Sequence, residues 1–122
     1  VNDSWLQNGQ TNVPVTEFKT NIQSTINICR NHSWPLTLVG PVIGDDSLLK
    51  AISNGNEPDI GYDRKKVMEY NQILKNLADK NQVQFINLID NLSFEDFSDG
   101  LHPNESGHHK MFEEIKRLLD FG

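Results

Sequence analysis

The stretch VQFINL, residues 83–88, decides the fold of this 122-residue chain. It is a short, largely apolar run that lies between two segments with helical periodicity, which is typical of a strand buried inside a sheet. A second run of the same kind, LTLV at residues 36–39, precedes it. We therefore predict two buried strands, at 36–39 and 83–88.

Amphipathic helices are predicted on both sides of these strands. In the first helix Phe18, Ile22 and Ile26 recur at steps of four and so share one face. Asp63 and Asn104 stand where the N-caps of the second and third helices are expected. The three predicted helices cover about 16–30, 64–80 and 105–120.

The order helix, strand, helix, strand, helix indicates a parallel sheet with crossover helices, so the predicted fold class is α/β. Parallel sheets are covered on both faces and normally contain more than two strands. We therefore expect at least one further strand before Val1. The alternative is a complete but very small α/β domain.

Composition excludes several classes of function. Eleven Lys and Arg against seventeen Asp and Glu give a net charge of −6, so the chain has no basic surface for nucleic acid. No apolar run approaches the roughly 18–20 residues of a membrane span. The single cysteine, Cys29, excludes a disulfide within the chain. No signal peptide is visible, and the first residue is Val1 rather than Met.

The connection at residues 40–62 is too long for a simple link between a strand and a helix, since most connections have about 4–6 residues. It leaves the carboxyl end of a predicted parallel strand, where open α/β sheets bind their ligands. Residues 46–52 are expected to form a short helix. The apolar residues of this segment either form a substrate wall or pack on the body of the domain: Leu48, Leu49, Ile52 and Ile60.

The sequence DGLHPN, residues 99–104, carries the chemistry. A carboxylate three residues before a histidine, across a turn with glycine, can reach Nδ1 of the imidazole and fix its tautomer. Nε2 of His102 is then directed outward as a general base. The alternative is a turn at the entry to the last helix, with Asp99 as a local cap.

The chain also opens with Val1-Asn2-Asp3. This opening and the late DGLHPN together resemble the SGNH hydrolases, the GDSL family of esterases and lipases, which have a Gly-x-Asn-Asp block and an Asp-x-x-His block. The resemblance implies a flavodoxin-like three-layer α/β/α fold with a parallel sheet, whose N-terminal part is missing here. Residues 1–122 are then the C-terminal portion of a single hydrolase domain.

The resemblance also implies the role of each residue in hydrolysis of a carboxylic ester. His102 takes the proton of a serine, Asp99 orients His102, and the side-chain amide of Asn2 donates to the oxyanion. No metal or organic cofactor is required, and the partners are a small ester substrate and the missing part of the protein. Trp5 either lines the substrate pocket or packs over the loop.

The nucleophile is where this sequence departs from the family pattern. The family's Gly-Asp-Ser block belongs upstream of Asn2, and GDDSL at 44–48 replaces it poorly because of its extra Asp and its position after a later strand. We therefore do not expect Ser47 to be the nucleophile, and we expect the chain alone to be inactive. The competing hypothesis is a non-catalytic, flavodoxin-like binding module.

His102, His108 and His109 could also be taken as the ligands of a metal ion. His108 and His109 lie next to each other on the last predicted helix, so their side chains point about 100° apart. No further residue lies in register with them as a third ligand, and His102 precedes the helix. We therefore predict no metal site.

Overall fold

The computed structural model describes residues 1–44 and 61–119. Its elements follow the predicted order, and the three predicted helices are confirmed to within two residues at each end. The elements are the one-turn 3₁₀ helices η1 (Asn2–Ser4) and η2 (Phe94–Asp96), the helices α1 (Val15–Asn31), α3 (Arg64–Asn81) and α4 (Glu105–Leu118), and the strands β1 (Leu6–Gln7), β2 (Gln10–Thr11), β3 (Thr37–Val39) and β4 (Gln84–Ile86).

The two predicted strands form a parallel pair, as expected. Leu38 of β3 lies opposite Phe85 of β4. Both strands are shorter than the apolar runs that predicted them: β3 begins one residue later, at Thr37, and β4 covers only Gln84–Ile86. Pairing stops after Val39 because Pro41 follows Gly40 and a proline has no N–H for a further ladder bond. The last bond of this kind runs from the N–H of Gly40 to the carbonyl of Ile86, at 2.8 Å.

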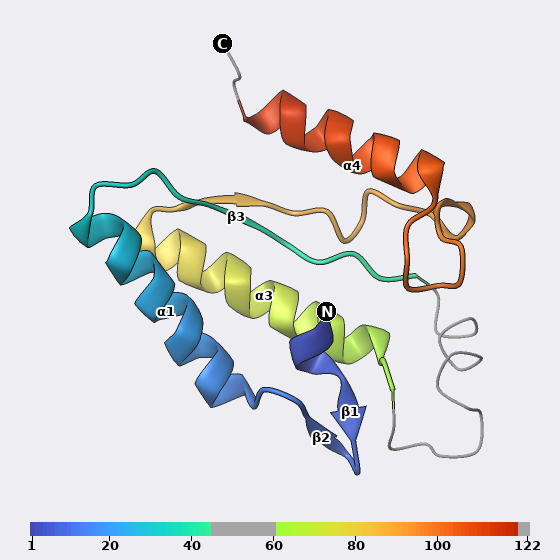
Figure 1. The fold of residues 1–122 in the computed structure, drawn as a ribbon, viewed down its shortest axis with the longest axis horizontal. Coiled ribbons are helices and arrows are strands. Elements are labelled where there is room, and N and C mark those ends of the chain that lie inside the picture. Colours follow the sequence, from blue (N-terminus) through green and yellow to red (C-terminus); the bar gives the residue numbers. More distant parts are fainter. Residues whose placement is uncertain (45–60, 120–122) are drawn as a thin grey trace.

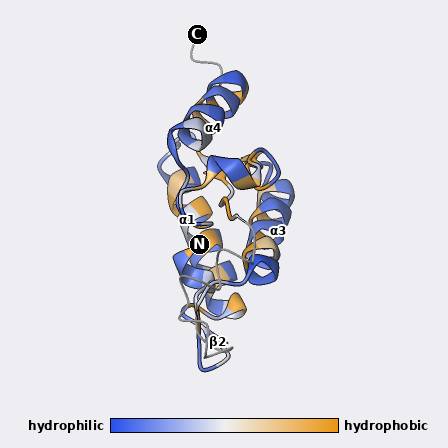
Figure 2. Cartoon of the chain, turned by 90° about the vertical axis from the view of Figure 1, so that its right-hand side faces the viewer, coloured by the Kyte–Doolittle hydropathy of each residue, from blue (hydrophilic) through white to orange (hydrophobic). Residues whose placement is uncertain are grey.

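Helices cover both sides of this strand pair (Figure 1). On one side α1 and α3 lie side by side, and their buried residues form a core cluster: Phe18, Tyr70, Ile73 and Leu74. On the other side α4 packs Met111 and Ile115 against a second cluster, which contains Ile86 and Leu88. Each long helix carries both hydrophilic and hydrophobic residues (Figure 2), as expected of helices with one face on a core.

The predicted N-caps are confirmed. The Asp63 carboxylate accepts the backbone N–H of Lys65 at 2.7 Å, and the Asn104 side chain accepts that of Gly107 at 3.1 Å. These bonds satisfy amides that the first turn of a helix leaves without a partner. Gly107 also allows the start of α4 to approach η2 closely, because a Cβ there would lie 2.4 Å from the carbonyl oxygen of Asp96.

The hairpin of β1 and β2 was not predicted. Its turn, Asn8-Gly9, has positive φ at both residues (52° and 72°), the conformation that a two-residue hairpin requires. An Asn-Gly pair is the usual sequence signal for this turn, so the hairpin could have been found. The expected short helix at 46–52 and its apolar wall lie outside the described residues.

Candidate active site

Asp99 and His102 are brought together in the turn before α4. Oδ2 of Asp99 lies 2.6 Å from Nδ1 of His102, and Oδ1 accepts the backbone N–H groups of His102 at 2.8 Å and Leu101 at 2.9 Å. These hydrogen bonds, the His102 N–H first, lower the pKa of Asp99 from 3.8 to about 2. A carboxylate on Nδ1 leaves Nε2 available for proton transfer, on a side chain that is 70% exposed.

The backbone holds this turn at both ends. Ser98 donates its N–H to the carbonyl of His102 at 2.8 Å, and Phe97 forms a β-bridge with Pro103. Gly100, at a φ of 86°, adopts a conformation that glycine accommodates readily. Backbone contacts therefore close the turn on both sides.

Gly44, which follows β3, supports the turn through a backbone contact. Its N–H donates to the carbonyl of Gly100 at 2.8 Å. A Cβ at Gly44 would lie 2.4 Å from that oxygen, so only glycine fits against the turn without a shift. The motif GDDSL therefore begins with a glycine that supports the candidate site, while Ser47 lies outside the described residues.

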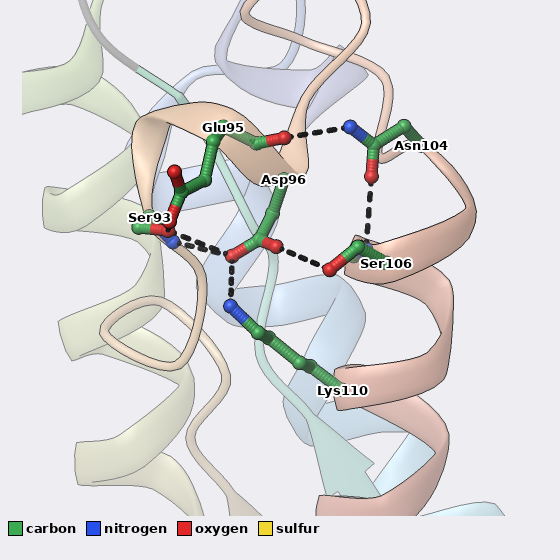
Figure 3. A network of polar contacts seen from close by, with 7 residues as sticks. Ser93, Glu95, Asp96, Asn104, Ser106 and Lys110 are labelled. Atoms are coloured by element: carbon green, nitrogen blue, oxygen red, sulfur yellow. Dashed lines mark hydrogen bonds and ion pairs between the residues drawn. The ribbon is translucent and has the colours of Figure 1, made fainter.

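A buried carboxylate lies just before the same turn (Figure 3). Asp96 is fully buried, and its oxygens accept from Ser93, from the Ser106 hydroxyl at 2.8 Å and from Lys110 Nζ at 2.6 Å. The Lys110 ammonium and the Ser93 N–H hold the pKa of Asp96 well below its usual value. Asp96 therefore ties η2 to α4, the two elements that border the turn.

Asn2 lies in η1 and is exposed. Its Oδ1 accepts the hydroxyl of Tyr62 at 2.9 Å, and its backbone carbonyl accepts Nδ2 of Asn12 at 3.1 Å. Trp5 is half-buried and packs its ring edge-on against Tyr62, with the centroids 4.7 Å apart. The structure therefore shows a packing contact of Trp5 with Tyr62. A contact between Trp5 and the substrate stays a prediction.

Asn2 and the Asp99–His102 pair are connected indirectly, through residues that pack on one buried cluster. Tyr62, which holds Asn2, and Leu101, which lies inside the turn, both pack against the same buried cluster: Ile43, Val67 and Ile89. Ile43 and Ile89 follow the carboxyl ends of β3 and β4. No hydrogen bond joins Asn2 directly to His102, although both residues lie in the described part of the chain.

Sequence reasoning missed Tyr62, Gly44 and Asp96. Each acts through a partner distant along the chain. Only Gly44 belongs to a motif discussed above, GDDSL, and that motif did not predict its contact with Gly100. Within residues 1–44 and 61–119 no three His, Cys, Asp or Glu side chains gather as a metal site. In the same ranges no helix has the length and hydrophobicity that crossing a membrane requires.

Comparison with known families gives a match over most of the chain. The family model for GDSL-like lipases and acylhydrolases matches residues 3–115. This range begins one residue after Asn2 and includes Asp99 and His102. No curated protein matches the sequence significantly.

Solved structures with the same fold include several esterases. An acetylxylan esterase from Geobacillus stearothermophilus matches with a TM-score of 0.65 and 17% identity, over 90% of this chain and 49% of that one. A GDSL-like lipase from Bacteroides thetaiotaomicron matches with a TM-score of 0.64 and 18% identity, over 84% of this chain and 50% of that one. A putative acylhydrolase from Bacteroides fragilis matches with a TM-score of 0.64 and 20% identity, over 81% of this chain and 48% of that one. The chain spans about half the length of these structures, and the mixed α/β arrangement is consistent with part of an SGNH hydrolase fold.

Proposed function

Because the chain belongs to the GDSL-like lipase and acylhydrolase family, also called SGNH hydrolases, we propose that the protein hydrolyses carboxylic esters with a serine nucleophile upstream of Val1. The observation that carries the proposal is the Asp99 carboxylate on Nδ1 of an exposed His102. An imidazole held in this way can act as a general base toward a serine hydroxyl. No metal or organic cofactor takes part.

Residues 1–122 are, in this proposal, the C-terminal portion of one flavodoxin-like, three-layer α/β/α domain. Two features support it. Within the described residues β3 is paired on one edge only, and a groove of about 320 Å³ lies beside it, lined by residues of η1, α1, β3 and α3. Val1 lines this groove together with Val39 and Pro41. A strand that led into Val1 would therefore end beside the carboxyl end of β3, and we propose that it runs parallel to β3.

The mechanism assigns one task to each group. Nε2 of His102 removes the serine proton as the serine oxygen attacks the ester carbonyl, and it returns that proton to the leaving alcohol. Water then repeats the sequence on the acyl-enzyme and releases the acid. Asp99 stabilises the imidazolium in both steps, and Nδ2 of Asn2 donates to the oxyanion.

A structural neighbour supports the pairing of a serine with a histidine. In the acetylxylan esterase of G. stearothermophilus, alanine variants of a serine and of a later histidine are described as catalytic mutants. Substrates that fit the proposal are short acyl esters, acetylated sugars, lysophospholipids and thioesters. Trp5 donates its backbone N–H to the carbonyl of Asn2, the proposed oxyanion donor, at 3.2 Å, and is the residue through which we propose substrate contact in this chain.

The test uses the full-length protein with p-nitrophenyl acetate and butyrate. His102→Ala should lower kcat by at least about 10³-fold, because it removes both proton transfers. His109→Ala, an exposed histidine on α4, is the matched control and should leave kcat unchanged. Unchanged turnover in His102→Ala, or a residue other than serine in the upstream Gly-Asp-Ser block, would favour the non-catalytic binding module.

A further inference from the structure

We propose that Tyr62 is a positioning residue that sets the orientation of the Asn2 amide toward the oxyanion. The inference rests on the proposed function, because it assumes that Asn2 is an oxyanion donor. Its observation is the hydrogen bond of 2.9 Å from the Tyr62 hydroxyl to Oδ1 of Asn2. No motif predicts this contact, which joins residues sixty positions apart.

The orientation matters because the two ends of a carboxamide have nearly the same shape and opposite polarity. With Oδ1 bound to Tyr62, both hydrogens of Nδ2 remain available to an oxyanion. If the amide turned over, its carbonyl oxygen would face the developing negative charge. A hydroxyl that donates to Oδ1 favours the productive orientation before the substrate binds. The oxyanion donor is then already oriented, so it need not reorient during the reaction.

Tyr62 is itself held from three directions. The neighbouring Gly61 exchanges two backbone hydrogen bonds with Leu6, at 2.8 and 2.9 Å, which fixes the Tyr62 backbone to the hairpin that follows Asn2. Trp5 packs edge-on against the Tyr62 ring, and the ring also contacts the cluster that Leu101 contacts. Burial raises the pKa of the Tyr62 hydroxyl, so the hydroxyl remains a donor at neutral pH.

Tyr62→Phe in the full-length protein tests the proposal, because it removes the hydroxyl and keeps the ring contacts. We expect kcat for p-nitrophenyl butyrate to fall about 10-fold with KM nearly unchanged, a smaller loss than the 10²–10³-fold typical for a deleted oxyanion donor. Tyr70→Phe is the matched control. Its hydroxyl bonds to Thr11 and Val13, so it should lose thermal stability and retain kcat.

A double-mutant cycle with Asn2→Ala separates positioning from a general structural effect. If Tyr62 acts through the Asn2 amide, Tyr62→Phe lowers kcat in the wild-type background and has no further effect once Asn2 is alanine. An equal loss in both backgrounds, or no loss in the wild-type background, overturns the proposal. A normal kcat in Asn2→Ala alone instead removes Asn2 from the oxyanion site, which is a failure of the proposed function.

Discussion

Asp99 shows how one side chain can organise a turn and an imidazole at the same time. One of its oxygens accepts two backbone N–H groups, which leaves the other to accept Nδ1 of His102. Donors of this kind favour the ionised carboxyl group over the protonated one. The local geometry of the candidate site therefore follows from a single ionised residue and the backbone around it.

The ionisation of Asp99 can be measured directly. Its pKa of about 2 is below the ordinary 3.8, so Asp99 stabilises the folded state above about pH 4, and this contribution is lost as the pH falls toward 2. In the full-length protein labelled with ¹³C-aspartate, the Asp99 carboxyl signal should still be that of the ionised form at pH 3. The urea-unfolded protein is the control and should titrate near 3.8. A folded-state midpoint at or above 3.8 would contradict the assigned hydrogen bonds.

At the scale of elements, the position of α4 depends on a short polar junction with η2. Asp96 of η2 is bonded to Ser106 and Lys110 of α4, and its backbone carbonyl accepts the N–H of Asn104 at 2.8 Å. Gly107 lies against the same carbonyl. Because the Asp99–His102 turn runs between these two elements, this junction determines where the turn is held.

Asp96→Asn tests the junction. The amide has nearly the same shape as the carboxylate but cannot pair with the Lys110 ammonium, and its NH₂ faces donors. We expect the Tm of the full-length protein to fall by about 5 °C or more, because a buried charged hydrogen-bond network is lost. Asp79→Asn, which removes an exposed pair with Lys75 at 2.7 Å, should shift Tm by less than about 1 °C. Equal shifts in the two variants would refute the importance of the junction.

At the scale of the whole molecule, the described residues leave apolar surface beside an open sheet edge. β3 is hydrogen-bonded to β4 alone, and Val39 at its end is 43% exposed. On the other side Phe112 of α4 is 56% exposed. An open parallel edge with uncovered apolar residues is prone to pair with other chains.

Expression of residues 1–122 alone should therefore give a self-associating product. We expect polydisperse higher oligomers or aggregate in size-exclusion chromatography with light scattering, and a single monodisperse species for the full-length protein. Co-expression of the upstream segment as a separate chain is the control, because it should restore solubility by pairing with β3. A monomeric fragment that unfolds cooperatively would support a complete small domain instead.

The sequence alone determined the features that depend on neighbours along the chain. Periodicity and capping residues predicted α1, α3 and α4 nearly to their ends, because the bonds of a helix join residues three or four positions apart. The contact of Asp99 with His102 was predictable for the same reason. The strand ends were less so, since a strand lasts only as long as its partner can pair with it.

Tertiary structure alone decided which distant residues support the site. Tyr62 meets Asn2, Gly44 meets Gly100, and Lys110 meets Asp96 through space, across separations of fourteen to sixty residues. Contacts of this kind depend on how the helices pack on the sheet. A tyrosine, a glycine or a lysine can have many different partners, so the residue type alone does not predict which contact forms. The spacing of residues therefore predicted the contact between Asp99 and His102, whereas the packing of the helices on the sheet determined which groups hold that pair in place.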